Sequence, residues 1–312
     1  MTALATSQQP LTTSMNPMQT DGFEFVEYAS LDPAPLEKLF TDLGFSKIAK
    51  HKTKNVWLWR QGDINFILNA EKNSQAEGFY SAHGPSANAM AFRVKDSAAA
   101  IKRAKELGAE VIESRANPGE LHIPAIRGIG GSYLYLVDRY GTNGSIYDID
   151  FVPLPGVDQN PKGVGLTYID HLTHNVGRGR MNHWAAFYER IFNFREIRFF
   201  NIEGKATGLH SRALTSPCGK IRIPINESSD DRSQIQEYLD AYRGEGIQHI
   251  ALATDDATKD PALRAEILLL QSDISREGGD ANGARKPLAK VCASSHLRER
   301  SVPSSQARTT GP

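Results

Sequence analysis

The chain has 312 residues, enough for two domains of ordinary size, and its 36 Lys and Arg side chains balance 36 Asp and Glu side chains. A net charge of zero gives no electrostatic basis for binding nucleic acid or an anionic membrane surface. No apolar run approaches the roughly 20 residues that a membrane span requires. The only cysteines, Cys218 and Cys292, are too few for a disulfide framework or a cysteine-rich zinc site. We therefore expect a cytoplasmic protein without nucleic-acid or membrane partners.

The first ordered elements are predicted to follow a polar leader, residues 1–21, which we expect to be disordered. The leader has no Lys or Arg and no compact apolar run, so it does not resemble a signal peptide. A β-like run begins at Phe23. A helix is then predicted from Asp32 as N-cap to Gly44, with its apolar side chains at helical spacing on one face.

The rest of this half alternates strand patterns with one more helix. Asp96 is the predicted N-cap of that helix, and Gly108 is its predicted end. A turn at Gln61-Gly62-Asp63 separates two of the strands. The predicted strands cover residues 55–59, 64–68, 89–94, 133–137 and 146–151.

The same succession restarts after residues 156–163, a segment rich in Pro, Gly, Asp and Asn that we interpret as a linker. One helix is predicted from Asn182, as N-cap, to Asn193. Another is predicted from Ser233 to Gly244. The predicted strands of this half cover residues 168–176, 195–200, 211–214, 221–225 and 248–254.

An internal repeat relates the two halves. The segment LEKLFTDLGFSKI at 36–48 matches WAAFYERIFNFREI at 184–197 in pattern, and NAMAFRVKD at 88–96 matches QHIALATDD at 248–256 position by position. We therefore predict an α+β protein with two copies of one domain, residues 22–155 and 164–256. Each copy would consist of two strand-helix-strands modules that curl a sheet into a half-open barrel, whose mouth is a common place for a small-molecule site.

Residues 257–312 differ from the rest of the chain. Every Phe, Tyr and Trp lies between Phe23 and Tyr242, and no strand pattern follows Thr254. We therefore expect an atypical, low-complexity tail that leaves the last module incomplete, as a truncation or frameshift would. The acidic residues of the tail lie in no strand pattern, so we nominate none of them for a site: Glu266, Glu277 and Glu299.

Two of the nine histidines occupy related places in the repeat. We align His171 with Tyr28, in the strands that open the third and first modules, and His249 with Ala89. Histidines on corresponding strands of a curled sheet can converge on one metal ion, and neutral imidazole suits Fe, Zn or Cu. His174 is three residues from His171 and should face the other side of the strand, so we exclude it as a ligand.

A third ligand is expected to be a carboxylate. Two histidines and one carboxylate leave open positions on a metal, the arrangement of non-haem Fe(II) oxygenases. The repeat predicts this carboxylate in the last strand of the second copy, at the place that Asp148 occupies in SIYDIDF of the first. The sequence contains no counterpart of that strand.

Four motifs in the second copy resemble 4-hydroxyphenylpyruvate dioxygenases of the bacterial type: YIDHLTHNV at 168–176, SRALTSPCGKIRIPIN at 211–226, RSQIQEYLD at 232–240 and GIQHIALATDD at 246–256. The resemblance covers about residues 22–256. It implies the vicinal-oxygen-chelate fold, also called glyoxalase/bleomycin-resistance-like, built of βαβββ modules. It also implies Fe(II) as cofactor, with His171 and His249 as ligands, and a third ligand, a Glu, in a C-terminal strand that this chain lacks.

The resemblance also implies a substrate pocket made by Ser211, Pro224, Asn226, Gln234 and Gln248. Of these, Ser211, Asn226 and Gln234 would be catalytic. The expected reaction uses O₂ to decarboxylate the α-keto acid 4-hydroxyphenylpyruvate and hydroxylate its ring, giving homogentisate in tyrosine and phenylalanine catabolism. Members of the family are expected to be homo-oligomers.

Two alternatives remain open from the residues. One is an oxygenase that makes 4-hydroxymandelate from the same substrate. The other is a non-catalytic, truncated product, because the predicted carboxylate strand is missing.

Overall fold

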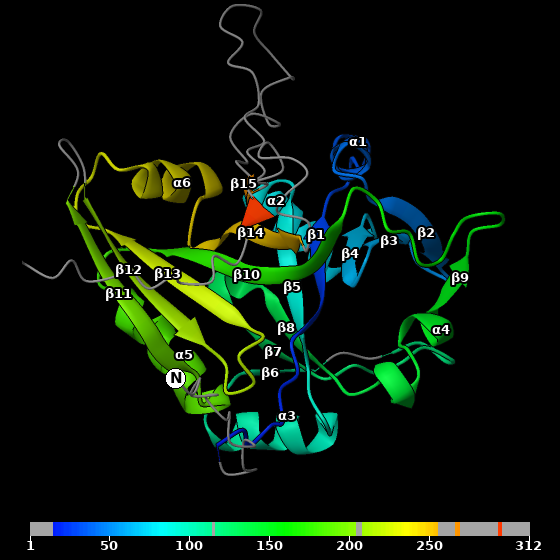
Figure 1. The fold of residues 1–312 in the computed structure, drawn as a ribbon, viewed down its shortest axis with the longest axis horizontal. Helices are drawn as coiled ribbons and strands as arrows, with labels where there is room; N and C mark the ends of the chain where they lie inside the picture. The colour runs from blue at the N-terminus through cyan, green and yellow to red at the C-terminus, as the bar shows by residue number, and fades with distance from the viewer. Residues whose placement is uncertain (1–14, 114–115, 204–207, 255–265, 269–292, 295–312) are drawn as a thin grey trace, which may run out of the picture.

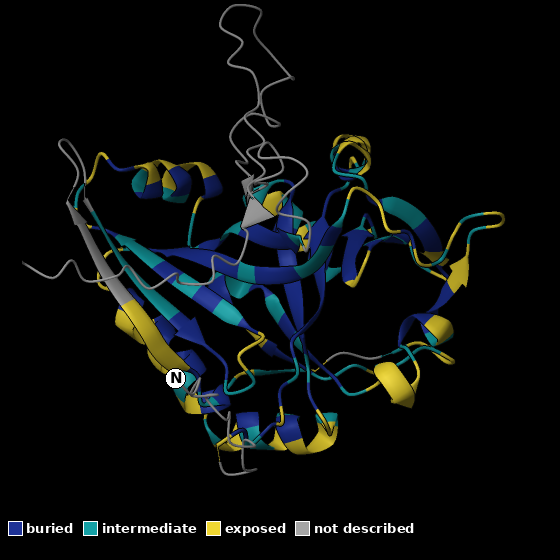
Figure 2. Cartoon of the chain, viewed as in Figure 1, coloured by how far each residue is buried: buried dark blue, intermediate teal, exposed yellow. Residues whose placement is uncertain are grey.

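The protein is built around two mixed sheets, one from each half of the chain, which lie side by side (Figure 1). This computed structural model describes residues 15–113, 116–203, 208–254, 266–268 and 293–294. Within these residues, no helix has the length and apolar character needed to cross a bilayer. Buried side chains concentrate in the strands and on the inner faces of the helices, whereas the outer helix faces are exposed (Figure 2).

The first sheet has the order β6-β7-β8-β5-β1-β4-β3-β2-β9 within the described residues. Its strands are β1 (Phe23–Ala29), β2 (Ser46–His51), β3 (Val56–Gln61), β4 (Ile64–Asn69), β5 (Ser86–Arg93), β6 (Val111–Ile112), β7 (Ala125–Arg127), β8 (Tyr133–Val137) and β9 (Phe151–Pro153). The helical segments of this half are α1 (Ala34–Asp42), α2 (Gln75–His83), α3 (Ser97–Glu106), η1 (Ile129–Gly131), η2 (Gly141–Asn143) and α4 (Tyr147–Asp150).

The second sheet has the order β11-β12-β13-β10-β14-β15, and β16 also pairs with β14. Its strands are β10 (Leu166–Val176), β11 (Arg195–Glu203), β12 (Gly208–Thr215), β13 (Arg222–Ser228), β14 (Gly246–Thr254), β15 (Glu266–Leu268) and β16 (Ala293–Ser294). Two helices accompany this sheet: α5 (Met181–Phe192) and α6 (Gln234–Tyr242).

Most predicted helix ends agree with the structure, for the reasons that the sequence indicated. The side chains of Asp96 and Ser233 each accept a hydrogen bond from the backbone N–H three residues on. Asn193 ends α5 in the left-handed conformation, which Asn tolerates better than most residues. Two predicted caps are wrong. Helix α1 begins at Ala34 with Pro33, and not Asp32, as its N-cap, and no side chain caps it. Helix α5 already begins at Met181, and the Asn182 side chain accepts a hydrogen bond from Arg212 instead.

One predicted strand, residues 146–151, is wrong. These residues form the short helix α4, and only Phe151 belongs to a strand, β9, which pairs with β2 at the far edge of the first sheet. The sequence alternates apolar and polar residues here, but Ile146 and Asp150 are also spaced one helical turn apart, and the backbone N–H of Asp150 bonds to the Ile146 carbonyl. Helix α2 and strand β2 were not predicted.

Ordered contacts also begin before Phe23. Met18 is 3% exposed and belongs to the main hydrophobic core. The Asn16 side chain bonds to both the backbone N–H and the carbonyl of Thr20, which closes a tight turn. The part of the predicted leader that the structure describes therefore packs on the domain.

The strand registers show how the two copies correspond. In β1 and β5, Glu27 pairs with Ala89; in β10 and β14, Thr173 pairs with His249. The register shifts immediately after Glu27 in the first copy and immediately after Thr173 in the second. The alignment of His249 with Ala89 is therefore consistent with the paired strands.

The proposed alignment of His171 with Tyr28 is wrong by three residues. His171 pairs with Ala251, and the corresponding residue Ala91 pairs with Phe25. Tyr28 corresponds instead to His174, and both side chains are fully buried against the helix of their own copy. The β-bulges lie at equivalent places in the two strands, so the error lies in the alignment of the opening strands by sequence pattern and not in the bulges.

Two short strands lie beyond Thr254, where no strand was predicted. β15 runs antiparallel to β14, with Glu266 opposite Ala251, and β16 runs parallel to β14. The edge of β14 is therefore partly paired. Glu277 and Glu299 lie outside the described residues.

We expect residues 22–155 to fold as an autonomous domain with a cooperative thermal melt. The strands of the first sheet all fall within this segment, and so do all the buried residues of a second core cluster around Phe25 and Ile146. Its Tm should be lower than that of the full chain, because Phe92 would lose its ring contacts with Phe192 and Phe194.

The matched control is the segment 15–155, which retains Met18 and should melt at a higher temperature than 22–155. Circular dichroism on both segments is the measurement. Little secondary structure and a non-cooperative melt in both would contradict the prediction.

Candidate metal and substrate site

The two predicted metal ligands lie together on adjacent central strands of the second sheet. His171 is on β10 and His249 is on β14, and their ring centroids are 5.5 Å apart. Because Thr173 is directly opposite His249 and two residues from His171, both histidines belong to the same face of the sheet. The His171 side chain is 22% exposed, so it remains accessible to an ion.

Asp170 fixes the orientation and tautomer of His171. Asp170 Oδ2 lies 2.8 Å from His171 Nδ1, and a carboxylate oxygen can only accept, so Nδ1 carries the proton. Arg222 holds the other oxygen of this carboxylate through a 2.7 Å hydrogen bond. Nε2 of His171 therefore presents its lone pair to the site. Neighbouring strand residues ordinarily face opposite ways, but the register shift between Ile169 and His171 brings this pair together.

His249 is held in the same tautomer by its own preceding residue. Gln248 Oε1 lies 2.5 Å from His249 Nδ1, and an amide oxygen accepts, so Nδ1 is again the protonated nitrogen. Nε2 is 3.0 Å from the Thr173 hydroxyl, which can donate to its lone pair. Both histidines thus offer Nε2 as the electron-pair donor, which is the form that binds a metal.

The described residues bring together no group of three or more His, Cys, Asp or Glu side chains placed to hold a metal. The predicted place for the carboxylate was based on Asp148, which lies in α4 and not in a strand beside β5. The strand beside β5 is β8, where Tyr135 is paired with Ala91. In the second copy the backbone of Glu266 is paired with Ala251, which corresponds to Ala91.

The predicted substrate residues on β12 and β13 lie on the same sheet face as the histidines. Ser211 on β12 pairs with Asn226 on β13, and Pro224 on β13 pairs with Ala213; β13 lies between β12 and β10. Asn226 Nδ2 donates a 3.4 Å hydrogen bond to Asn175 Oδ1. Ser211, Pro224 and Asn226 are all partly exposed, so a polar surface extends from the histidine pair across three strands.

Gln234 and Gln248 occupy different surroundings from these three. Gln234 is exposed in the first turn of α6, directly after its cap Ser233, and none of the described hydrogen bonds joins it to the strand residues. The Oε1 atom of Gln248 is engaged by His249, as described above. Asp170, Thr173 and Arg222 were not predicted. A usable sequence signal for Asp170 was present, since a hydrogen-bond acceptor directly precedes each of the two histidines.

His174 lies on the opposite face of β10 and is fully buried. Its Nε2 is 2.7 Å from the hydroxyl of Tyr188 on α5. Burial lowers the pKa of His174 to about 3, so the ring is neutral at physiological pH. It is a core residue that supports the strand carrying His171.

The His174 environment predicts a pH dependence of stability. The unfolded side chain takes up a proton near pH 6.5, whereas the folded one does not until the pH approaches 3, so the free energy of unfolding falls as the pH drops through this window. Lowering the pH from about 7.5 to about 5.5 should reduce the free energy of unfolding by about 1.4 kcal/mol through this group. Over the same interval the free energy of unfolding of His174→Phe should fall by that much less than that of the parent protein, as measured by urea denaturation. Identical pH dependence in both proteins would contradict the assignment.

Each of the two copies matches a known protein family. Residues 14–152 match the family described as hydroxyphenylpyruvate dioxygenase, N-terminal, and residues 168–260 match the glyoxalase/bleomycin resistance protein/dioxygenase superfamily. The chain is 61% identical over 248 residues to hemolysin VllY of Vibrio vulnificus, covering 78% of this chain and 69% of that protein. It is 59% identical over 244 residues to 4-hydroxyphenylpyruvate dioxygenase of Pseudomonas aeruginosa, covering 77% and 68%.

The fold is also that of a solved enzyme structure. A mutant of 4-hydroxymandelate synthase from Streptomyces coelicolor superposes with a TM-score of 0.66 at 22% identity, covering 77% of this chain and 72% of that chain. This likeness concerns the fold alone: mixed sheets of the vicinal-oxygen-chelate type, curled but not closed into barrels. The sequence identity of about 60% to the two relatives, over more than two thirds of their length, identifies the family more specifically than the structural likeness does. The chain belongs to the 4-hydroxyphenylpyruvate dioxygenase family.

Proposed function

We propose that the second copy is the catalytic domain of an Fe(II)-dependent dioxygenase that converts 4-hydroxyphenylpyruvate and O₂ to homogentisate. The proposal places the protein in tyrosine and phenylalanine catabolism, in the cytoplasm, as a homo-oligomer when the family's full architecture is present. It is supported by the identity to 4-hydroxyphenylpyruvate dioxygenase. The single structural observation that carries it is the pair His171 and His249, both in the Nε2 lone-pair tautomer on one sheet face.

In this proposal His171 and His249 hold the iron. The tautomers and the shared face fit an ion that prefers neutral imidazole ligands. When bound, Fe(II) would supply chelation of the substrate's α-keto acid and electrons for the reduction of O₂. The protein's own part is to orient the substrate and keep the two imidazoles in position.

The polar strand residues are proposed to bind the substrate. Ser211, Asn226 and Gln234 carry uncharged hydroxyl and amide groups, which suit a phenol that must be held without a full charge. Asn226 already donates to Asn175, so its own Oδ1 remains to accept from the phenol O–H. Pro224 would form an apolar wall beside them. Gln248 has its Oε1 engaged by His249 and retains its amide N–H donors.

Product analysis tests the reaction class. In the protein to be tested, residues from 257 on are replaced by the C-terminal segment of the Pseudomonas aeruginosa relative, and the protein is incubated with Fe(II), O₂ and 4-hydroxyphenylpyruvate. Homogentisate as the main product supports the proposal. 4-Hydroxymandelate as the main product would instead assign the alternative oxygenase, and no product from a well-folded protein of this kind would favour a non-catalytic scaffold.

Asp170→Asn is expected to weaken Fe(II) binding by about 10- to 100-fold, the usual effect of removing a group that orients a ligand. The amide can still accept from His171, but it loses the charge that fixes the tautomer and pairs with Arg222. Anaerobic Fe(II) titration of both proteins is the measurement. The control is Asp240→Asn, an exposed residue of α6. Equal affinity of Asp170→Asn and the parent would show that Asp170 does not position His171.

A further inference from the structure

The first sheet contains a cavity of about 200 Å³ at the place where the second sheet carries the histidine pair. Phe25 corresponds to His171, and Ala89 corresponds to His249, so this cavity has lost both metal ligands. Glu27 stands in place of Thr173, and Tyr135 lies on the neighbouring strand β8. The lining is therefore not a remnant of the histidine site but a different set of groups.

Apolar and aromatic side chains form most of the wall. Phe25 and Tyr135 have ring centroids 5.7 Å apart, and Phe151 lies against His51 at 5.3 Å. The remaining apolar lining comes from Val56, Ile67, Leu121, Ile123 and Ile146. A cavity of this size takes a body about as large as one aromatic ring, since an apolar cavity of about 150 Å³ binds benzene.

Glu27 carries the main polar feature of the cavity. It is 8% exposed, and its Oε1 accepts hydrogen bonds from Asn69 and Asn88, at 2.9 Å and 2.7 Å. Among the described residues, no hydrogen bond is made to Oε2, although Glu27 lines the cavity. Burial raises the pKa of Glu27, and the hydrogen bonds from the two Asn side chains oppose the rise. A carboxylate in this position is stabilised by any cation that enters the cavity.

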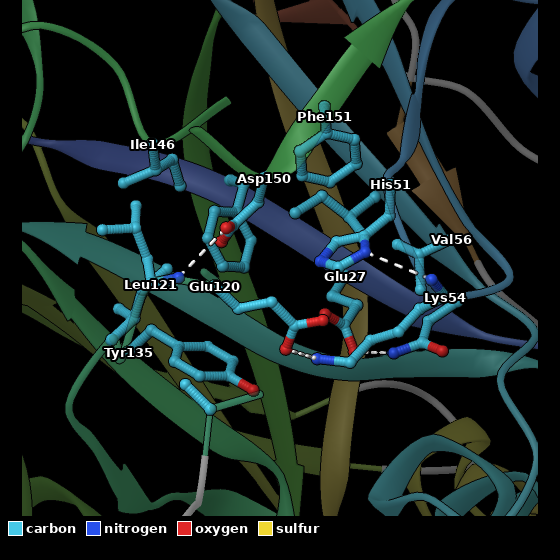
Figure 3. A pocket seen from close by; sticks show the side chains of 15 residues that line it. Glu27, His51, Lys54, Val56, Glu120, Leu121, Tyr135, Ile146, Asp150 and Phe151 are labelled. Atoms are coloured by element: carbon cyan, nitrogen blue, oxygen red, sulfur yellow. Dashed lines mark hydrogen bonds and ion pairs between the residues drawn. The ribbon is translucent and has the colours of Figure 1, made fainter. Parts of the chain in front are cut away.

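The nearby lysine is already engaged elsewhere. Lys54 Nζ lies 2.8 Å from Glu120 Oε2. Although burial raises the pKa of Glu120, hydrogen bonds from Lys54 and Thr53 lower it to about 2. Figure 3 shows Glu27, Glu120 and Lys54 gathered on one side of the pocket, with His51 next to Lys54 and Asp150 farther away, near Leu121.

The rest of the lining adds a further carboxylate and a neutral imidazole. Asp150 is 8% exposed, and its Oδ1 accepts from the Leu121 backbone N–H. His51 Nδ1 accepts from the backbone N–H groups of Thr53 and Lys54, so its Nε2 is the protonated nitrogen. Burial lowers the pKa of His51. With His51 neutral, the lining has three carboxyl groups and one lysine, an excess of negative charge.

We propose that this cavity of the first copy is a second small-molecule site, which binds a compact organic ammonium ion with an aryl or branched alkyl body. The ammonium group donates to Glu27 Oε2, while the apolar body lies against Phe25, Tyr135 and Phe151. The carboxyl groups disfavour an anionic ligand, and the volume suits a body of about one aromatic ring. The site is independent of the proposed iron site, because it shares no residue with it.

The test uses the full chain and benzylamine as probe, with benzyl alcohol as a neutral probe of the same ring and similar size. Calorimetric titration should give benzylamine an affinity at least about tenfold higher than benzyl alcohol. Glu27→Gln, which can still accept from Asn69 and Asn88, should remove that preference and leave benzyl alcohol binding unchanged. The matched control Glu237→Gln, at an exposed position of α6, should behave like the parent protein.

Two further variants keep the outcome decisive. His249→Ala should leave benzylamine binding intact; if it abolishes binding, the amine binds at the histidine pair and the proposal is wrong. If Glu27→Gln shows no cooperative melt and is therefore unfolded, Asp150→Asn is tested in its place. This variant should bind benzylamine with lower affinity than the parent protein does. No binding of benzylamine to the parent, or equal affinity for both probes, would overturn the proposal.

Discussion

Replacing either His171 or His249 with alanine is expected to abolish saturable Fe(II) binding. Their rings lie edge to face on one side of the sheet, and Nδ1 of each donates its proton to an acceptor, so that Nε2 carries the lone pair that binds a metal. The described residues supply no group of three ligating side chains, so neither histidine has a substitute there. Equilibrium dialysis under anaerobic conditions measures the bound iron. We expect a loss larger than that of Asp170→Asn, which removes only an orienting group.

His174→Ala is the matched control, since His174 is on the same strand but the opposite face. Iron binding should change much less than in the other two variants, because His174 contacts Tyr188 and not the site. The protein should nevertheless lose about 2–4 kcal/mol of stability, since the change leaves a cavity and an unpaired Tyr188 hydroxyl. Equal losses of iron in all three variants would show that the assigned strand face is wrong.

The fold could be predicted largely because the apolar spacing, the caps and the repeat all indicated the same elements. Strand β8 agrees with the prediction to the residue, and α3 begins at its predicted cap Asp96. Helix α2 was missed because only Ala76 and Phe79 are buried along it, which gives no recognisable apolar face. The strand predicted at residues 146–151 failed because a six-residue segment can satisfy both periods.

The site could be predicted only in part. The repeat indicated the correspondence of His249 with Ala89, but the opening strands β1 and β10 were aligned three residues out of register, since His171 corresponds to Phe25 and not to Tyr28. Both strands carry bulges at equivalent places, and residue spacing alone does not reveal a bulge. The contact between Asp170 and His171 depends on such an irregularity. That contact therefore required the structure.

In a restored version of the protein, residues from 257 on are replaced by the C-terminal segment of the Pseudomonas aeruginosa relative. We expect the present chain to turn over 4-hydroxyphenylpyruvate at a small fraction of the rate of this restored version. Within the described residues, the two neutral imidazoles are joined by no third ligating side chain, so this part of the chain gives Fe(II) no anionic ligand. The ion is then held more weakly and keeps more uncompensated charge. Loss of an orienting group alone costs about 10–100-fold, and loss of a direct ligand should cost more. Poorer exclusion of water from the open half-barrel would add to the defect.

Oxygen consumption and homogentisate formation, with added Fe(II), are measured side by side for the two proteins. Comparable turnover would contradict the prediction and would mean that an acidic residue of the tail, or water, completes the metal site. Glu266→Gln then tests the acidic residue whose backbone lies opposite Ala251, on the strand beside the one that carries His249. Loss of activity in Glu266→Gln would identify Glu266 as the third ligand, since neutral Gln cannot replace the charge of a carboxylate. Unchanged activity would exclude Glu266 and leave another acidic residue of the tail, or water, in that role.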